Sequence, residues 1–193
     1  MKGTARRSTD PAEDRRLAEE LLRSPKERAE NVMITDLLRN DMGRVARPGS
    51  VQVAQLLQVE SQPTFHALTS TIGAELTAGT GLEEVMAALF PCGSVTGAPK
   101  TSTMGIIREL EPAPRGIYCG TMGFAEPEGP WAFNVAIRTV QHEVASAEVV
   151  YGTGGGITWD SDPAAEYGEA LLKASFLPGA PGEWKEGRPA VGR

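Results

Sequence analysis

The sequence predicts an α+β fold, in which helices and antiparallel strands occupy different parts of the chain. Two observations point to it. Residues 9–45 contain helix start signals and apolar residues at helical spacing, whereas residues 116–158 are rich in β-branched and aromatic residues separated by turn residues. No helix-like pattern separates these late strands, so they are expected to pair in antiparallel fashion. A doubly wound sheet is therefore not favoured.

Two helices are expected first. Asp10 before Pro11 is an N-cap with proline in the first turn, and it predicts a helix through residues 12–22. A Ser-Pro pair repeats this start signal immediately before residues 26–45, whose apolar residues recur at helical spacing. The sequence RPGS then predicts the end of the second helix.

The middle of the chain alternates between strand-like and helix-like segments. Residues 51–60 and 64–76 resemble strands, and short helices are expected at 81–90 and 103–110. Between these helices, the segment FPCGSVTGAPKTST (residues 90–103) holds two glycines, two prolines and five hydroxyl residues. That composition predicts an irregular loop.

The last third is expected to form strands, one helix and a tail. Three strand-like segments occur at 116–125, 131–141 and 147–158. A capped helix is predicted within residues 160–177, which close the folded body formed by residues 1–177. The Pro- and Gly-rich residues 178–193 are predicted to be a flexible tail.

Composition excludes several classes of function. A formal net charge of −6 argues against a nucleic-acid-binding surface, which needs clustered Lys and Arg. No apolar run approaches membrane-spanning length, and the N-terminus lacks the apolar core of a signal peptide. Cys92 and Cys119 form neither a disulfide framework nor a metal-binding spacing, so they are expected to be packing residues. The chain is predicted to be soluble and cytoplasmic.

The closing helix places charged side chains on one face. Glu166, Glu169 and Lys173 lie at i, i+3 and i+7, so two carboxylates and an ammonium share that face. From the helix alone, a solvated face with one intrahelical salt bridge is the preferred interpretation. A binding site is the alternative.

Three further features leave two interpretations open. Gly154, Gly155 and Gly156 offer backbone amides that could cradle an anion, but consecutive glycines also mark bulged strand ends. Arg138 within an apolar strand-like segment either covers a surface or enters a polar pocket. His66, considered alone, is more often a satisfied core residue than a catalyst.

Six motifs occur along the chain in the order ENVMITDLLRND, PTFHALTSTI, GSVTGAPK, AIRT, YGTGGGI and AAEYGEALLKA. Taken together, they resemble the chorismate-utilising enzymes, which include anthranilate synthase component I, aminodeoxychorismate synthase component I, isochorismate synthase and salicylate synthase. The similarity extends over nearly the whole chain, from residue 2 to about residue 177. It implies the C-terminal part of their layered fold of antiparallel sheet and helices.

This resemblance implies a metal site. Glu30 and Glu169 match the two carboxylates that hold Mg²⁺ in the family, and Glu166 matches a nearby acid. Oxygen ligands completed by substrate are what Mg²⁺ prefers. The metal would in turn hold a carboxylate of chorismate.

The resemblance also implies the remaining contacts with chorismate. Thr96 and neighbouring amides of the GSVTGAPK loop would close over the substrate. Arg138, Lys173 and the amides of residues 154–156 would bind its carboxylates. His66 matches a histidine that lies beside the reacting ring.

Lys2 points to one branch of the family. The sequence KGT, which begins at Lys2, is similar to a segment of aminodeoxychorismate synthases, where anthranilate and isochorismate synthases have Ala at the Lys position. The resemblance implies that this lysine attacks C2 of chorismate and expels the 4-hydroxyl, after which ammonia from a glutamine amidotransferase subunit displaces the lysine at C4. The product is 4-amino-4-deoxychorismate, a precursor of p-aminobenzoate and folate.

The family pattern begins upstream of this sequence. Family members have further strands and site residues before the KGT segment, so the chain is expected to be the C-terminal part of a longer polypeptide. Exposed sheet edges would favour self-association or pairing with a separate N-terminal half. Lys2 is then expected to be exposed and the isolated chain inactive. The alternatives are anthranilate synthase component I and a non-catalytic fragment that binds chorismate or a partner.

Overall fold

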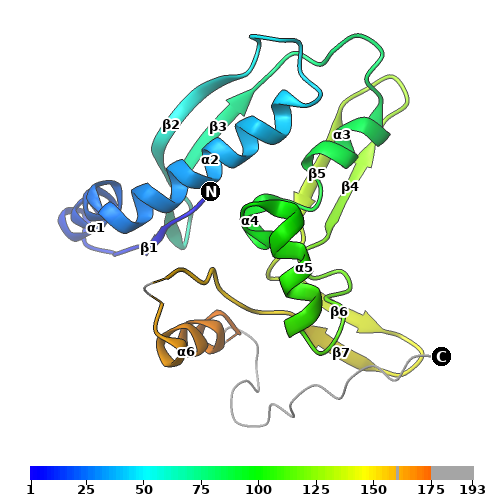
Figure 1. The fold of residues 1–193 in the computed structure, drawn as a ribbon. Coiled ribbons are helices and arrows are strands. Elements are labelled where there is room, and N and C mark those ends of the chain that lie inside the picture. Colours follow the sequence, from blue (N-terminus) through cyan, green and yellow to red (C-terminus); the bar gives the residue numbers. More distant parts are fainter. Residues whose placement is uncertain (160, 175–193) are drawn as a thin grey trace. The chain divides into compact units, whose positions relative to one another are not determined.

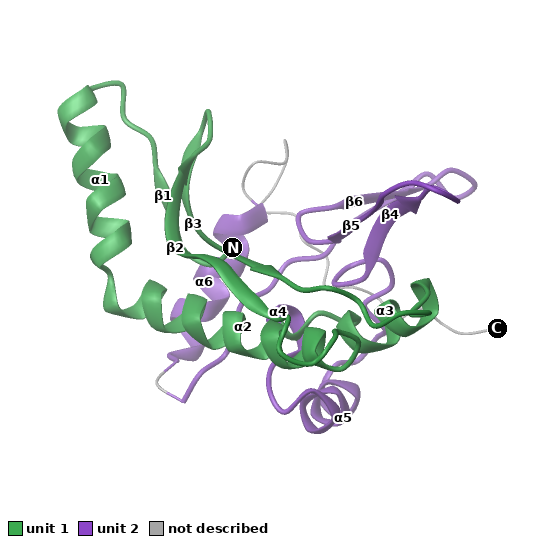
Figure 2. Ribbon diagram, turned by 90° about the horizontal axis from the view of Figure 1, so that it is seen from above, with its two compact units in different colours: residues 1–93 green, residues 94–193 purple. Residues whose placement is uncertain are grey.

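The computed structural model describes residues 1–159 and 161–174 (Figure 1). The chain divides into two compact units, residues 1–93 and residues 94–193, and each is considered by itself (Figure 2). Both units combine helices with antiparallel strands. The predicted α+β class is confirmed.

Unit 1 contains a three-stranded antiparallel sheet with the order β1-β3-β2. Helices α1 and α2 pack against this sheet, and α3 packs against α2 (Figure 1). The register pairs Thr4 with Ala67 and Ser61 with His66, so β3 is the central strand. The elements are β1 (Thr4–Arg6), α1 (Pro11–Arg23), α2 (Pro25–Gly43), β2 (Gln52–Ser61), β3 (Phe65–Gly73) and α3 (Leu82–Leu89).

The predicted helix starts are confirmed. The Asp10 side chain accepts a hydrogen bond from the backbone N–H of Ala12 at 3.0 Å, and Pro11 begins α1. The Ser24 side chain likewise caps α2 by accepting from the backbone N–H of Glu27 at 3.4 Å. Such caps satisfy amide groups that the helix itself leaves without a partner.

The core of unit 1 is centred on β3. Leu68 is 0% exposed, and Ala67 beside it is also buried. Leu21 of α1 and Ile34 of α2 are buried as well. A central strand covered by helices buries its side chains most completely, which explains why three consecutive residues of β3 are buried.

Unit 2 contains two separate hairpins, β4-β5 and β6-β7. The late strands therefore pair with their sequence neighbours, as predicted. Helix α4 begins at Gly93, which is the last residue of unit 1. The elements are α4 (Gly93–Thr96), α5 (Lys100–Leu110), β4 (Thr121–Ala125), β5 (Trp131–Val135), β6 (Val140–Glu143), β7 (Glu148–Tyr151) and α6 (Pro163–Ala174).

Several predicted boundaries are wrong. The predicted strand 116–125 begins only at Thr121, and 131–141 is divided into β5 and β6. The breaks coincide with Cys119 at φ 64° and Arg138 at φ 51°, where the backbone leaves the extended conformation of a strand. The short strand β1 was not predicted, and the predicted loop 90–103 contains helix α4 and the start of α5.

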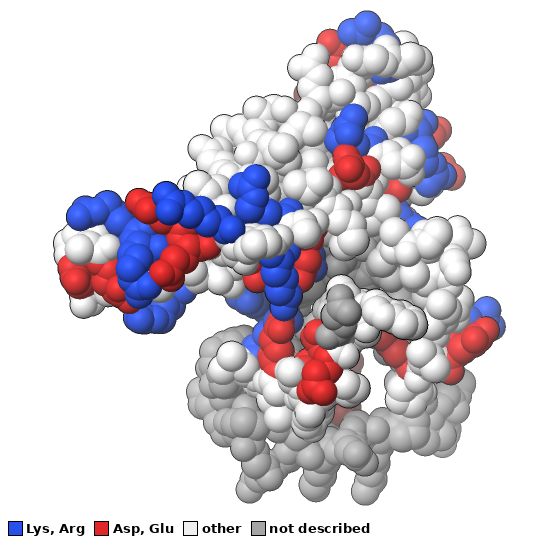
Figure 3. All heavy atoms as spheres, turned by 60° about the vertical axis from the view of Figure 1, so that its left-hand side comes forward, with Lys and Arg blue, Asp and Glu red and all other residues white. Residues whose placement is uncertain are grey.

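Two predicted features fall partly or wholly outside the described residues, namely the end of the closing helix beyond residue 174 and the tail 178–193. Within the described ranges, none of the helices is long and apolar enough to cross a lipid bilayer. Acidic and basic side chains are intermixed on the molecular surface (Figure 3). On α1, for example, Arg16 forms ion pairs with both Glu13 and Glu20.

Replacing Leu68 by Ala should destabilise unit 1, because truncation of a fully buried side chain removes apolar contacts and leaves a cavity. The expected loss in the free energy of unfolding is about 2–5 kcal/mol. Urea denaturation followed by circular dichroism measures it. The control is Leu56→Ala on β2, where the leucine is 54% exposed. Equal effects of the two substitutions would contradict this description of the core.

Candidate functional site

Lys2 is held by the sheet of unit 1. Its backbone N–H donates to the carbonyl of Leu68 at 3.0 Å, and the N–H of Leu68 donates to the carbonyl of Gly3 at 3.0 Å. These bonds extend the ladder between β1 and β3 by one step, and Lys2 is half-buried. The expectation that Lys2 is exposed is therefore wrong, because the unpredicted strand β1 fixes this end of the described chain.

A buried amide connects Lys2 to helix α2. Asn31 is 2% exposed, and its Nδ2 donates to the carbonyls of Leu68 at 3.0 Å and Lys2 at 3.5 Å. Its Oδ1 accepts a hydrogen bond from the Ser70 hydroxyl at 2.5 Å. The hydroxyl of Thr35, which is also buried, donates to the backbone carbonyl of Asn31 at 2.8 Å. Both buried side chains therefore have hydrogen-bond partners.

Sequence reasoning overlooked Asn31 and selected its neighbour Glu30. Glu30 is half-buried on α2, about 100° around the helix from Asn31. One local signal was available, because an Asn inside a helix is unfavourable unless its side chain has a specific partner. The structure therefore places Lys2 and Glu30 in the same unit and connects their backbones through one side chain.

His66 is buried on β3 with both ring nitrogens in hydrogen bonds. Nδ1 lies 2.9 Å from the Ser61 hydroxyl, and Nε2 lies 3.1 Å from Oδ1 of Asp14 on α1. The Asp14 carboxylate also accepts from the Arg7 guanidinium at 2.9 Å and from the backbone N–H of Ser8 at 2.9 Å. The Arg7 guanidinium, assisted by Ser8 and His66, holds the pKa of the Asp14 carboxyl well below its usual range.

In unit 2 the glycine segment lies against helix α6. The Lys173 ammonium donates to the carbonyl of Gly154 at 3.0 Å and pairs with Glu169 at 2.7 Å. Thr153 donates to the carbonyl of Ala170 at 2.9 Å, which fixes the same segment on the helix. The predicted salt bridge on this helix face is present, and the face also contacts the glycines.

Glu166 lies close to the same backbone. Its Oε1 accepts from the Ser161 hydroxyl at 2.7 Å, and its Oε2 would lie 3.0 Å from a β-carbon at position 155. The absence of a side chain at Gly155 therefore allows this carboxylate to approach the main chain. The predicted residues Glu166, Gly155 and Lys173 lie close together in unit 2.

Arg138 does not lie in a strand. It is exposed and precedes β6 by two residues, so the prediction of Arg138 within a strand is wrong. Val140 pairs with Tyr151, which places Arg138 and the glycine segment at the same end of the β6-β7 hairpin. Burial raises the pKa of Tyr151, and the nearby positive charge of Arg138 partly opposes that effect. The Tyr151 hydroxyl donates to the carbonyl of Lys173 at 3.2 Å.

Thr96 is the last residue of α4 and is half-buried. Its hydroxyl donates to the carbonyl of Gly97 at 3.5 Å, and Gly97 has a φ of 95° that permits the turn toward α5. The contacts of Thr96 with a substrate remain a prediction.

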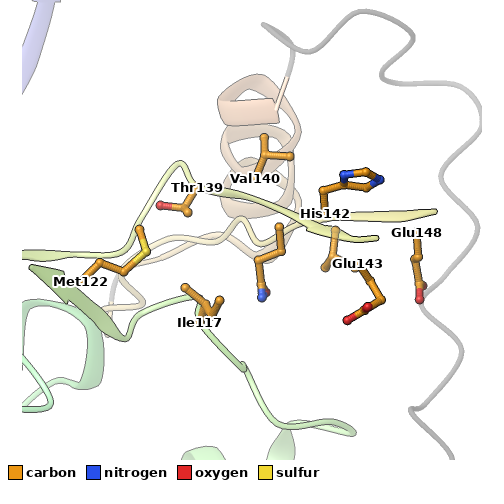
Figure 4. Close-up of a pocket in the computed structure, with 9 residues that line it drawn as sticks. Ile117, Met122, Thr139, Val140, His142, Glu143 and Glu148 are labelled. Carbon is orange, nitrogen blue, oxygen red and sulfur yellow. The ribbon is translucent and has the colours of Figure 1, made fainter. Parts of the chain in front are cut away.

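Unit 2 contains a cavity of about 410 Å³ (Figure 4). Its lining comes from the β6-β7 hairpin and from the segment before and at the start of β4. The lining residues are Ile117, Met122, Thr139, Val140, Gln141, His142, Glu143, Glu148 and Val150. None of these lining residues is among the predicted site residues.

The side chains suited to a metal are distributed over both units. Glu30 belongs to unit 1, whereas Glu166 and Glu169 belong to unit 2. Among residues 1–159 and 161–174, no three His, Cys, Asp or Glu side chains gather into a metal-binding cluster. Their chemistry nevertheless fits Mg²⁺, because all three offer carboxylate oxygens.

Carboxylates, an ammonium and bare glycine amides are groups suited to an anionic substrate and a hard cation. The chain belongs to the chorismate binding enzymes, whose family model matches residues 1–178. The family predicted from the six motifs is confirmed.

Curated relatives and solved structures agree with this family assignment. The chain is 45% identical over 177 residues to aminodeoxychorismate synthase component 1 of Escherichia coli, covering 92% of this chain and 39% of that protein. It is 46% identical over 177 residues to anthranilate synthase component 1 of Streptomyces coelicolor, covering 92% and 34%. Anthranilate synthase component I from Streptococcus pneumoniae matches with a TM-score of 0.73 and 33% identity over 90% of this chain and 41% of that one. The chain thus spans about two-fifths or less of the length of these relatives.

Replacing Asn31 by Leu should destabilise unit 1, because the Leu68 carbonyl would keep only its bond from the Lys2 N–H and the Ser70 hydroxyl would lose its acceptor. The expected cost is about 1–3 kcal/mol. Urea denaturation measures it, and Asn40→Leu on the exposed side of α2 is the matched control. An Asn31→Leu variant as stable as the Asn40→Leu variant would contradict the role assigned to this amide.

The Arg7–Asp14 ion pair predicts a pH-dependent stability. Because Arg7 depresses the pKa of Asp14 in the folded state, the pair stabilises the fold above the unfolded pKa of about 4 and loses this effect as the pH falls toward the folded pKa. Arg7→Gln should therefore lower the free energy of unfolding at about pH 7, and the loss should shrink toward about pH 3. Urea denaturation across this range tests it, with Arg16→Gln as control. A loss that does not change with pH would exclude the ionic contribution.

Proposed function

We propose that the polypeptide to which this chain belongs is an aminodeoxychorismate synthase that converts chorismate to 4-amino-4-deoxychorismate in the cytoplasm, for p-aminobenzoate and folate synthesis. The observation on which the proposal depends is Lys2. It is half-buried, its backbone pairs with Leu68, and the Asn31 amide binds its carbonyl. A nucleophilic lysine requires such fixed placement, since orientation lowers the entropic cost of attack.

Lys2 would act as a covalent nucleophile. Its neutral amine attacks C2 of chorismate, a C–N bond forms, and the 4-hydroxyl departs with its bonding electrons. Ammonia then adds at C4 and the lysine leaves from C2. The ammonia would come from a glutamine amidotransferase subunit, in keeping with relatives that are named as component 1.

The carboxylates would hold Mg²⁺. Glu30 and Glu169 would bind it, with Glu166 nearby, and the bound ion would supply positive charge to a carboxylate of chorismate. The Glu169–Lys173 ion pair keeps the Glu169 side chain on the helix face that contacts the glycine segment.

Unit 2 would bind the carboxylates of the substrate. The Lys173 ammonium and the amides of residues 154–156 supply cationic and N–H donor groups, and Arg138 lies at the same end of the hairpin. A dianion that is transferred from water into a protein site needs cationic groups and hydrogen-bond donors to replace its hydration. Thr96 and its loop would close over the substrate.

A second candidate is anthranilate synthase component I. The 46% identity to the Streptomyces coelicolor enzyme favours it, because identity of this size does not separate the two branches. A third candidate is a fragment that binds chorismate or a partner without turnover, which the partial coverage of the relatives favours. Product analysis distinguishes all three.

Lys2→Ala should remove aminodeoxychorismate formation, with turnover falling by about two orders of magnitude or more. The assay uses chorismate, Mg²⁺ and ammonia, with the upstream segment of an aminodeoxychorismate synthase component 1 joined to this chain or added as a second chain. We expect the 193-residue chain alone to be inactive and the completed enzyme to be active.

The control for this experiment is Lys26→Ala, which changes an exposed lysine at the start of α2. Anthranilate as the product would assign the chain to the other branch. Full activity of the Lys2→Ala enzyme would refute the nucleophilic role.

Replacing Glu30 or Glu169 by Gln should weaken Mg²⁺-dependent binding of chorismate by about tenfold or more, because each substitution removes a carboxylate ligand. Calorimetric titration of the completed enzyme with chorismate, with and without Mg²⁺, measures the effect. Glu83→Gln on the exposed side of α3 is the control. Unchanged binding in both site variants would refute the assigned metal ligands.

A further inference from the structure

We propose that Ser61, His66 and Asp14 form a proton relay in unit 1, in which Asp14 and Arg7 are positioning residues that hold His66 in its Nε2–H tautomer. The Ser61 hydroxyl is the outward group of this relay. The tautomer of His66 follows from the hydrogen bonds and charges around the ring. The role of the relay in turnover rests on the proposed function.

The sheet register brings these groups together. Ser61 is the direct cross-strand partner of His66, so their side chains lie on the same face of the sheet, and the Ser61 hydroxyl reaches Nδ1 at 2.9 Å. On the other side of the ring, Asp14 in the first turn of α1 reaches Nε2 at 3.1 Å. The Arg7 guanidinium stabilises this arrangement by donating hydrogen bonds to the Asp14 carboxylate at 2.9 Å and to the carbonyl of Gln62, the residue after Ser61, at 2.7 Å.

The hydrogen-bond partners determine the tautomer. Asp14 faces a guanidinium and a backbone N–H, and its depressed pKa keeps it an ionised carboxylate that can only accept. The ring nitrogen that faces it, Nε2 of His66, must therefore be the donor. In the neutral ring Nδ1 is then an acceptor, and the Ser61 hydroxyl donates to it.

The same bonds define where a proton can enter. The His66 side chain is 3% exposed and both nitrogens already have partners, so the ring itself has no free nitrogen to offer a reactant. Ser61 is exposed. A proton passed to the Ser61 oxygen releases the original hydroxyl proton to Nδ1, so that an O–H bond breaks as an N–H bond forms and Ser61 remains a neutral hydroxyl.

The Asp14 carboxylate offsets the positive charge that this transfer creates on His66. The reverse transfer delivers a proton through Ser61. The proposed reaction needs both directions, because the departing 4-hydroxyl takes up a proton and the nitrogen added from ammonia loses one. A relay that accepts and returns one proton matches that requirement.

Nitrogen-15 NMR of the histidine rings tests the tautomer in the 193-residue chain at neutral pH. The sequence has only His66 and His142, and a His142→Gln variant assigns the two spectra. We expect the Nε2–H form at His66. Asp14→Asn should abolish this preference, since an amide can donate or accept, whereas Asp10→Asn at the N-cap of the same helix should preserve it. An Nδ1–H form, or a preference unaffected by Asp14→Asn, would overturn the proposal.

Turnover by the completed enzyme tests the outward role of Ser61. Ser61→Ala should lower kcat by about 10²-fold with KM unchanged, and Ser61→Thr, which keeps a hydroxyl, should recover most of the rate. Unchanged kcat in Ser61→Ala overturns the relay. If the completed wild-type enzyme forms no product from chorismate, the proposed function fails. The hydrogen-bonded arrangement is then tested by NMR alone, which should show the Nε2–H tautomer in the wild type and a changed Nδ1 chemical shift in Ser61→Ala.

Discussion

The buried amide of Asn31 connects three parts of unit 1 that lie far apart in the sequence. It binds the carbonyl of Leu68 on the central strand and the carbonyl of Lys2 before the first strand, while its own backbone belongs to α2. Buried polar groups are costly without partners, so this geometry allows little variation in how α2 lies on β3. The same bonds set the positions of Lys2 and of Glu30, the residue before Asn31. Asn31 therefore stabilises the packing of α2 on β3 and also positions two residues that are proposed to act in the site.

Local sequence signals predicted the capped helices of unit 1 and the salt bridge on α6. The caps at Asp10 and Ser24 depend on residues within one turn, and the Glu169–Lys173 pair depends on helical spacing, so both are visible in the sequence. The partners of Asn31 and His66 are not, because Leu68 lies 37 residues from Asn31 and Asp14 lies 52 residues from His66. Strand β1 and the left-handed residues Cys119 and Arg138 escaped prediction for the same reason, since tertiary pairing decides them.

The proposed functional groups are divided chemically between the two units. Unit 1 provides the nucleophile Lys2, the histidine relay and the carboxylate of Glu30. Unit 2 provides the Lys173 ammonium, the glycine amides and two further carboxylates, Glu166 and Glu169. A dianionic substrate bound with a divalent cation requires cationic and N–H donor groups together with carboxylate ligands, and the proposed set takes these groups from both units.

We propose that these two sets of residues bind one chorismate molecule in the completed enzyme. A crystal structure of that enzyme with chorismate and Mn²⁺ in place of Mg²⁺ tests this most directly, because anomalous scattering locates the metal independently of the protein. We expect one anomalous peak bonded to carboxylate oxygens of both Glu30 and Glu169, with the Lys2 side-chain nitrogen facing C2 of the substrate. A metal bound to only one of these glutamates, or chorismate bound away from Lys2, would contradict it.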